Sequence, residues 1–307
     1  MGVSVSTATG YGFRFVNAGT MENKGFEISA FGVPVRTENF SWTINANFAR
    51  NRNKVVDLYE ENENLQIATM QGGLTLNATK GQPFGTFRGV DYVYNDGQKV
   101  VGDDGYYLSS APDQVIGDVN PDWTGGIQNA FTYKNFALNF LIDIRHGGDV
   151  WSLDQYYGQA TGLYPESAGL NDLGNPSRLP IEDGGGVILP GVKEDGTPND
   201  IRVENYDSNV TPYGYANNPT AVGLFDASYV KLREAAITYT LPSEWLAKTN
   251  AIKSIDVSVV GRNLWIIHKN LPYADPEAGL SSGNIQGYQS GAYPTVRSLG
   301  FNVRFRF

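Results

Sequence analysis

Alternation of apolar and polar residues is the feature that most limits how this chain can fold. In residues 136–145, FALNFLIDIR, every second residue from Phe136 to Ile144 is apolar, and the positions between them include Asn, Asp and Arg. Successive side chains of a β-strand point to opposite faces, so a period of two places one face against an apolar medium and the other against water. The same pattern is found in residues 42–48, 255–259 and 299–307. We therefore predict long antiparallel strands with one apolar face.

A soluble β-sandwich would show the same alternation, so the choice between water and lipid depends on other details. The polar positions of these strands carry Asn, Asp, Arg and Ser rather than the mixture of Lys and Glu that is common on soluble surfaces. Aromatic residues stand near strand ends, where the interfacial girdles of an outer-membrane barrel need them: Trp42, Tyr133, Tyr239 and Trp265. These details favour strands that cross a lipid bilayer.

The connections between the strands are of two different lengths. Short turns are expected at 34–39, 133–135 and 241–253, whereas the connections at 57–121, 146–227 and 269–295 are long. Outer-membrane barrels have tight turns on the periplasmic side and long loops outside. Residues 57–121 hold either no membrane strand or a pair of them, and we expect roughly eight strands in the chain. The predicted fold class is all-β, part of an antiparallel transmembrane β-barrel with long extracellular loops.

Composition excludes several classes of protein. The chain has 307 residues and a formal net charge of −9, which argues against a nucleic-acid binder, because phosphates need a basic stripe to neutralise them. It has no Cys, which excludes a disulfide framework, a Cys-ligated zinc site and a Cys nucleophile. It contains no run of about 18 apolar residues, so no transmembrane helix is expected. The opening MGVSVSTATGYGF lacks the basic and apolar regions of a signal peptide.

The sequence contains no recognisable constellation for catalysis or metal binding. Its two histidines, His146 and His268, lie at strand ends far apart in the chain, and neither a zinc-protease motif nor a nucleophile elbow is present. The acidic residues at 95–105 lack the closing Glu of a calcium loop and are interpreted as turn residues. Asp275 and Glu277 are interpreted as part of a structured turn. We expect no enzyme activity, no metal and no cofactor.

A series of short motifs follows along nearly the whole chain. Its clearest members are NAGTMENKGFEISAF (17–31), FSWTINANFARNRNKVVDL (40–58) and DASYVKLREAAITYTLP (226–242). The others are GQPFGTFRG (81–89), IGDVNPDWTGGIQNAFTYKNFAL (116–138), VVGRNLWII (259–267), DPE (275–277), GYQSGAYPTVRS (287–298) and the final GFNVRFRF. In this order the motifs resemble the SusC/RagA family of TonB-dependent outer-membrane receptors. Lys231 stands where Arg is common in the family's Tyr-Val-Arg-Leu strand.

The resemblance implies an intact barrel of about 22 strands, a size class of plugged outer-membrane transporters. It implies an N-terminal plug that receives energy from the TonB–ExbB–ExbD system, and a SusD-like surface lipoprotein as a lid. The implied role is the uptake of glycans or oligopeptides in Bacteroidetes-like bacteria. Roughly eight strands cannot close such a wall, and neither a plug domain nor a signal peptide is recognisable. Residues 1–307 are therefore expected to be the C-terminal barrel portion of a longer receptor.

Two groups of residues are candidate contact sites in such a receptor. Aromatic rings in the connection 146–227 can stack on sugars or apolar ligands, and contact with substrate or lid is assigned to Trp151, Tyr156, Tyr157 and Tyr164. The alternative, which the residues favour, is a short amphipathic helix that packs this connection onto the barrel mouth. Lumen-facing arginines would hold the plug by ion pairs or steer anionic substrate, and these are Arg145, Arg262, Arg304 and Arg306.

The last strand is a third candidate site. Phe301, Val303, Phe305 and the terminal Phe307 alternate with polar residues, which resembles the signal that passes outer-membrane barrels to the barrel assembly machinery. A terminal strand with an exposed edge can pair with another strand by β-augmentation. The simpler interpretation is a last strand that faces lipid, and both interpretations can hold.

Two other functions fit part of the pattern. A soluble β-sandwich that binds carbohydrate would carry Lys and Glu on its outer faces, and the apolar outward residues of the last strand argue against it. A small self-contained outer-membrane barrel would need residues 25–33 to pair with residues 299–307, so that the sheet closes on itself.

Overall fold

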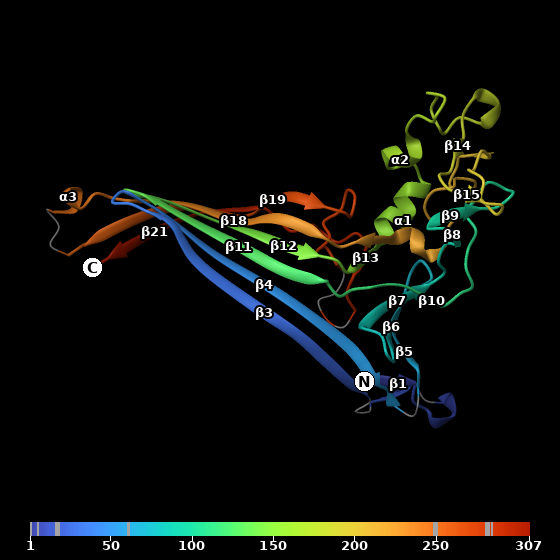
Figure 1. The fold of residues 1–307 in the computed structure, drawn as a ribbon, viewed down its shortest axis with the longest axis horizontal. Helices are drawn as coiled ribbons and strands as arrows, with labels where there is room; N and C mark the ends of the chain where they lie inside the picture. Colours follow the sequence, from blue (N-terminus) through green and yellow to red (C-terminus); the bar gives the residue numbers. More distant parts are fainter. Residues whose placement is uncertain are drawn as a thin grey trace.

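A seven-stranded antiparallel sheet, called the wall below, is the largest element of the structure, with the strand order β21-β19-β18-β12-β11-β4-β3. The structure is a computed structural model that describes residues 2–4, 6–15, 19–59, 62–247, 251–279, 283 and 285–307. The wall consists of β3 (Thr20–Arg36), β4 (Phe40–Asp57), β11 (Trp123–Tyr133), β12 (Phe136–His146), β18 (Tyr229–Thr240), β19 (Ser254–Lys269) and β21 (Ser298–Arg306). Figure 1 shows it as a long, twisted ribbon. The predicted all-β antiparallel class is confirmed, with seven wall strands observed where roughly eight were expected.

The short connections of the wall lie at one end and the long ones at the other (Figure 1). Residues 37–39, 134–135 and 241–253 join neighbouring strands at the first end, close to the predicted turns. In the tightest of these turns Lys134 adopts a left-handed φ of 50°. The turn at 241–253 contains the short helix α3 (Ser243–Leu246). Residues 17–18 of the first motif and 248–250 of this turn lie outside the described residues.

The two edges of the wall are β3 and β21. Among the described residues, β3 pairs with β4 and β21 pairs with β19, and the two edge strands do not pair with each other. The alternative of a small self-contained barrel, which needs that pairing, is therefore not what the structure shows.

The three long connections, 58–122, 147–228 and 270–297, fold together into one body, called the cap below. Residues 57–121 add no strand to the wall, because β4 pairs directly with β11, and they form a separate four-stranded sheet. The cap contains β5 (Asn64–Met70), β6 (Leu74–Thr79), β7 (Phe84–Gly89), β8 (Tyr94–Asn95), β9 (Gln98–Val101), β10 (Gln114–Asp118), β13 (Asp149–Ser152), β14 (Val187–Ile188), β15 (Val192–Lys193), β16 (Arg202–Val203), β17 (Leu224–Asp226), β20 (Tyr288–Gln289), α1 (Leu153–Ala160) and α2 (Pro165–Ala168).

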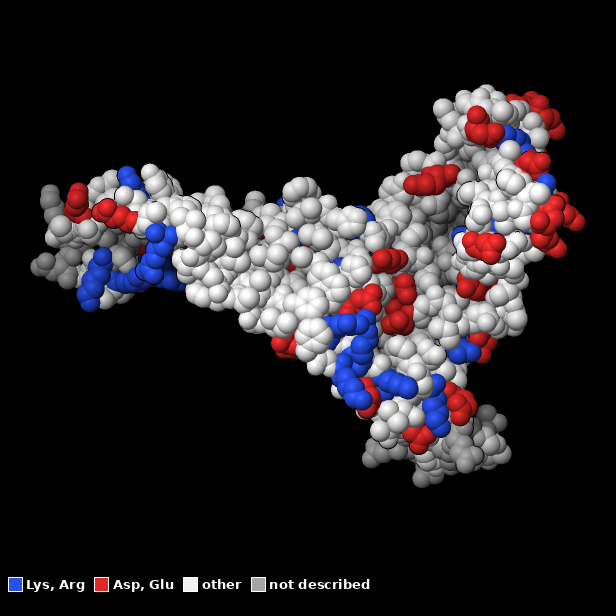
Figure 2. All heavy atoms as spheres, in the orientation of Figure 1, with Lys and Arg blue, Asp and Glu red and all other residues white. Residues whose placement is uncertain are grey.

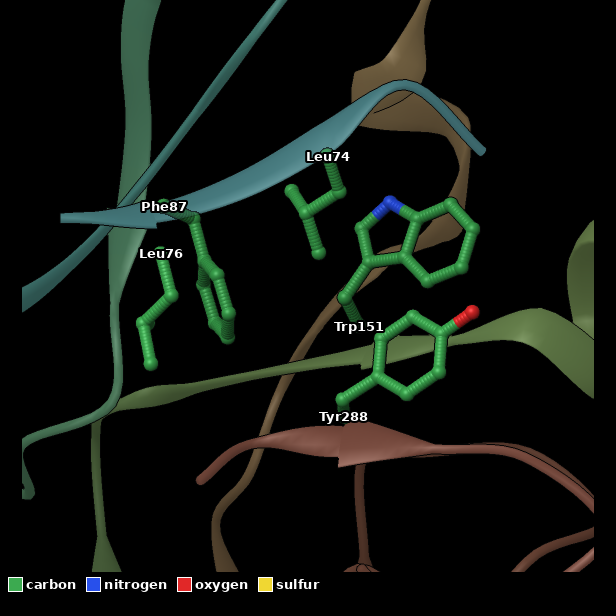
Figure 3. Packing of buried hydrophobic residues seen from close by; sticks show 5 residues of the cluster. All are labelled: Leu74, Leu76, Phe87, Trp151 and Tyr288. Atoms are coloured by element: carbon green, nitrogen blue, oxygen red, sulfur yellow. The ribbon is translucent and has the colours of Figure 1, made fainter. Parts of the chain in front are cut away.

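Strand pairing and a shared core hold the connections of the cap together. β15 pairs with β9, and β13 pairs with β20, so the second connection is bonded to both of the others. Figure 3 shows the largest core cluster, to which the first connection contributes Leu74, Leu76 and Phe87, the second Trp151 and the third Tyr288. The Trp151 and Tyr288 rings stack with centroids 5.3 Å apart.

Two glycines make room for the Trp151 ring. A Cβ atom on Gly72 would lie 2.3 Å from the ring, and one on Gly223 would lie 2.4 Å from it. Gly72 also has a φ of +94°, a conformation that residues with a side chain rarely adopt. The indole Nε1 donates a hydrogen bond of 2.8 Å to the carbonyl of Thr220. The ring is therefore fixed on every side by neighbours from the cap.

Among the described residues, no helix is long and apolar enough to cross a membrane.

Candidate functional site

The register of the wall brings its alternating apolar residues to one face, called the outward face. Leu138 stands opposite Phe131 and Ile237, Ile237 stands opposite Val259, and Val259 stands opposite Phe301. These side chains are open to the surroundings: Ile237 is 58%, Val259 54% and Phe301 69% exposed. An open apolar surface of this extent has to be covered by lipid or by another protein. A continuous apolar band on alternate residues is the lipid-facing surface of an outer-membrane barrel.

Aromatic side chains border this apolar band at both ends. Toward the short turns, Trp42 stacks on Phe131 with ring centroids 5.6 Å apart, and Tyr133 lies beyond them, exposed. Toward the cap, Phe48 stacks on Trp123 with centroids 5.4 Å apart. From Trp123 to Tyr133 the strand rises about 33 Å, which corresponds to a height of about 25 Å at the strand tilt of outer-membrane barrels. The spacing of the two aromatic rows therefore matches the apolar thickness of a bilayer.

On the opposite face, called the inward face, a cluster of charges fastens the cap to the wall. Lys231 Nζ of β18 lies 2.6 Å from Asp275 Oδ1 and 2.5 Å from Glu277 Oε2, which both belong to the connection 270–297. Arg233 Nη1 lies 2.8 Å from Glu277 Oε2, and Arg233 also pairs with Asp143 of β12. We call these five residues the latch. Lys231 and Asp275 are both buried, so the latch excludes water at its centre.

Hydrogen bonds favour the ionised form of two latch carboxylates, Asp275 and Glu277. Burial opposes the charged form of Asp275, but hydrogen bonds from Lys231 and Thr295 outweigh it and hold the pKa of this carboxyl below its usual range. Burial likewise opposes the charge of Glu277, and hydrogen bonds from Arg233 and Lys231 lower its pKa. Charges that are removed from water are stable only when each is paired and hydrogen-bonded.

The sequence alone does not reveal the latch, although the motifs 226–242 and 275–277 contain most of its residues. Ala278 N–H donates to the Asp275 carbonyl, so the interpretation of this segment as a turn is correct. That interpretation overlooked the second role of the two carboxylates, which is to bind the wall. The signal was present as the motifs 226–242 and 275–277, which hold four of the five latch residues, and Asp143 lies in the alternating segment 136–145. Only the fold shows that the two motifs meet.

A cavity of about 320 Å³ lies beside the latch, between the cap and the inward face. Its charged lining residues are Arg145, Asp149 and Glu277. Arg145 Nη2 donates a 2.7 Å hydrogen bond to the Val119 carbonyl, and Asp149 Oδ2 accepts a 2.9 Å hydrogen bond from the N–H of Asp118. Burial raises the pKa of Asp149 to about 6. A cavity with this lining can hold a polar or charged group, although no cluster of three or more potential metal ligands occurs among the described residues.

The aromatic candidates of the cap differ in accessibility. Trp151 is fully buried, so its ring is closed to ligands, contrary to the prediction, because three connections pack around it. Tyr156 is half-buried and packs on Trp151, with centroids 5.0 Å apart. Tyr157 is exposed. Tyr164 stacks on Tyr273, with centroids 4.6 Å apart.

The same segment also forms a short helix that packs the connection into the cap. Ser152 caps α1 by accepting a hydrogen bond of 3.1 Å from the N–H of Gln155, and Gln155 is buried. This helix is the element that the alternative interpretation expected. A contact of Tyr156, Tyr157 or Tyr164 with substrate or lid stays a prediction.

The four candidate arginines lie in different surroundings. Arg145 lines the cavity, and Arg262 Nε lies 2.9 Å from Glu234 Oε2. Arg304 stands opposite Asp256 in the register, and Arg306 Nη2 lies 3.6 Å from a carboxylate oxygen of Asp256. A role in holding a plug or steering a substrate stays a prediction.

The last strand has the orientation that its alternation predicted. Phe301, Val303 and Phe305 stand opposite Val259, Val257 and Ile255 on the outward face. These residues and Phe307 are exposed at an edge of the wall. A role in barrel assembly stays a prediction.

Comparison with known proteins gives one consistent result. The chain is 27% identical over 329 residues to TonB-dependent receptor P3 of Formosa agariphila, which covers 97% of the chain and 30% of that receptor. It is 26% identical over 337 residues to TonB-dependent receptor P26 of the same organism, which covers 99% of the chain and 31% of the receptor. The chain thus spans about 30% of the length of the curated relatives it matches. No family model matches it.

Solved structures show the same fold. The RagAB peptide transporter matches with a TM-score of 0.65 and 19% identity over 99% of this chain and 31% of the other. The RagAB peptide importer in its closed-closed state matches with a TM-score of 0.67 and 18% identity over the same shares of the two chains. The outward face suits lipid, and the curated relatives are receptors rather than enzymes. Over nearly its whole length the chain is similar to a portion of TonB-dependent receptors, and its fold is that of a β-barrel portion of the RagAB structures.

Proposed function

We propose that this chain forms part of the wall and the outer loops of a TonB-dependent importer that takes up nutrients, either oligopeptides or glycans. The observation that carries the proposal is the latch. Lys231 and Arg233 bind the cap to the inward face of a wall whose other face is apolar and exposed. A cap fixed in this way stands over the mouth of the barrel, where it can contact a substrate before the substrate enters.

The domain organisation belongs to the same proposal. Residues 1–307 would be the C-terminal barrel portion, and a plug elsewhere in the receptor would couple it to TonB–ExbB–ExbD. The exposed charged side chains of the inward face, among them Arg262 and Arg304, would face that plug. The edge strand β21 would be recognised by the barrel assembly machinery.

A SusD-like surface lipoprotein would cover the cap. The solved structures with this fold are described as a peptide transporter, which makes peptides the first substrate class to test. Exposed aromatic residues such as Tyr157 and Tyr206 suit either class, since aromatic rings stack on sugars as well as on apolar side chains.

The test is uptake by cells that produce the full-length receptor, with labelled oligopeptides and labelled glycans offered separately. We expect uptake of one class that is lost when TonB is deleted. Tyr157→Ala should lower this uptake. Tyr133→Ala is the matched control, because Tyr133 is an exposed tyrosine at the opposite end of the wall. Uptake of neither class, or uptake that persists without TonB, would contradict the proposal.

A further inference from the structure

The outward face of the wall becomes basic near the cap. Beyond Phe48, the outward residues of β4 are Arg50, Arg52 and Lys54, and Lys24 of β3 stands opposite Arg52. All four basic side chains are exposed, Lys24 to 75% and Arg52 to 45%. We call these four residues the basic band. Figure 2 shows basic side chains gathered over the cap end of β3 and β4.

The basic band begins where the apolar band ends. Phe26 stacks on Phe48 with ring centroids 5.7 Å apart, and Phe48 stacks on Trp123, so these rings form one aromatic row. Each outward residue beyond Phe48 adds about 7 Å along the strand, or roughly 5 Å of height at the tilt of barrel strands. Arg50 and Arg52 therefore lie about 5 and 10 Å above the row. The headgroup region of a bilayer extends roughly 5–8 Å beyond the hydrocarbon core.

Part of the positive charge in this band is not neutralised by the protein. Glu22 lies 2.8 Å from Lys24, and Asp122 lies 2.5 Å from Arg52. In the part of the chain that the structure describes, neither Arg50 nor Lys54 has an ion-pair partner within 4.0 Å, although Glu22 stands opposite Lys54 in the register. The chain as a whole carries a net charge of −9, so a positive patch here runs against its average. Arginine guanidinium groups bind phosphate through two parallel hydrogen bonds, which suits Arg50 to a phosphorylated headgroup.

We propose that the basic band binds a phosphorylated lipid of the outer leaflet. Its phosphate would lie between Arg50 and Lys54, and its acyl chains would lie along Phe26 and Phe48. By the same spacing Lys54 stands about 15 Å above the row, so its long side chain would extend down toward the phosphate. Lysine and arginine side chains can reach toward such a phosphate while their stems stay against the apolar wall. This site rests on the position of the wall in the membrane and not on import.

The experiment measures binding of bisphosphorylated lipid A to the full-length receptor in detergent by native mass spectrometry. Arg50→Gln combined with Lys54→Gln should weaken binding by about 25-fold, since each basic residue near an anionic surface contributes about fivefold. Arg304→Gln combined with Arg306→Gln removes the same charge from the inward face and should change binding by less than about twofold. The reduced electrophoretic mobility of the unfolded barrel reports whether each variant has folded.

Two further binding measurements, one with another variant and one with another lipid, test the proposal. Glu22→Gln frees Lys24 and should strengthen binding about fivefold, which tests the site even if the double variant does not fold. Dephosphorylated lipid A should bind far more weakly than the phosphorylated form. Equal binding of the two lipids, unchanged binding in both band variants, or equally effective displacement by inorganic phosphate would each overturn the proposal. Loss of lipid binding with uptake intact would separate this site from the proposed import.

Discussion

The wall and the cap are stabilised in different ways, although one chain passes between them several times. In the described part of the chain, the three buried hydrophobic clusters lie in the cap or where it meets the wall, and they are centred on Trp151, Val55 and Leu271. The middle of the wall has no such core among the described residues: its inward face is polar and its outward face is exposed. The cap therefore depends on its own packing, whereas the wall depends on its hydrogen-bond ladder and on surrounding lipid.

Because of this difference, a substitution in one region should change the stability of that region and leave the other unchanged. A change in the cap should loosen the cap while the ladder of the wall persists. A change on the outward face should act only when lipid is present. Both regions should respond at the latch, because it contains Asp143, Lys231 and Arg233 from the wall and Asp275 and Glu277 from the cap.

The largest effect is expected at the latch. Lys231→Met leaves the buried Asp275 carboxylate without its cation and should cost about 3–5 kcal/mol of cap docking, as removal of one partner of a buried pair does. Hydrogen exchange of residues 270–279 measures the loss. Lys193→Met is the matched control, because its 3.1 Å pair with Asp200 lies on the surface and should contribute less than about 1 kcal/mol. Unchanged exchange at 270–279 in the Lys231 variant would show that the latch does not hold the cap.

A cavity in the cap core should have a similar effect that is confined to the cap. Trp151→Ala removes the ring on which three connections pack and should destabilise the cap by about 3–5 kcal/mol. We expect faster proteolysis within 147–228 and unchanged hydrogen exchange in β11 and β12. Trp245→Ala, at an exposed residue of α3, is the control and should change neither. If β11 and β12 lost protection together with the cap, the two regions would form one cooperative unit.

A charge on the outward face tests the wall alone. Val259→Arg should cost about 2–4 kcal/mol in a bilayer, the cost of Arg near the midplane of an outer-membrane barrel. Asn302→Arg is the matched control, because Asn302 stands opposite Ser258 on the inward face and is exposed. Unfolding by urea in liposomes measures both. Equal stability of the two variants would remove the argument that the outward face contacts lipid.

The wall could be predicted from the sequence because its determinants are local. Alternation sets which residues face outward, and a turn such as 134–135 sets the register of its two neighbours, so Phe136 and Tyr133 had to stand opposite each other. The end of β18 and the start of β19 follow for the same reason from the expected turn at 241–253. The absence of a wall strand in 57–121 was not decidable, since it depends on β4 pairing with β11 across that segment.

The cap and the candidate site could be predicted only in part, because their contacts join residues far apart in the chain. Trp151 and Tyr288 belong to different connections, and no local pattern indicates that their rings stack. Trp151, a candidate for contact with substrate or lid, is therefore found buried in the cap. Lys231 and Asp275 are separated by 44 positions, and their pairing follows from the path of the third connection over the inward face.

The smallest effect, and the one that best separates the two regions by pH, is expected at Asp149. Its pKa is raised by burial from 3.8 to about 6 in the folded cap, so the unfolded carboxyl ionises first as pH rises. The stability of the cap should fall between about pH 4 and pH 6 and stay level above that range. Asp149→Asn removes the titrating group and should therefore abolish this fall. At pH 7 the variant cap should be more stable than wild type by about 1–2 kcal/mol, a figure that allows for the partial exposure of Asp149. Near pH 4 the two should be equally stable.

Subtracting the wild-type exchange free energy from that of Asp149→Asn at each pH isolates the contribution of this one carboxyl. The carboxyls of Asp275 and Glu277 have lowered pKa values, so their stabilisation is lost only as pH falls through the acidic range, and it cancels in the subtraction. Asp96→Asn is the matched control, since Asp96 is an exposed turn residue whose φ of 49° suits Asn equally well. A flat difference between pH 4 and pH 8 would mean that Asp149 is not buried in the folded cap. A fall of the same size in the exchange free energy of β11 would mean that the stability of the wall depends on pH as that of the cap does. The two regions could then not be distinguished by their response to pH.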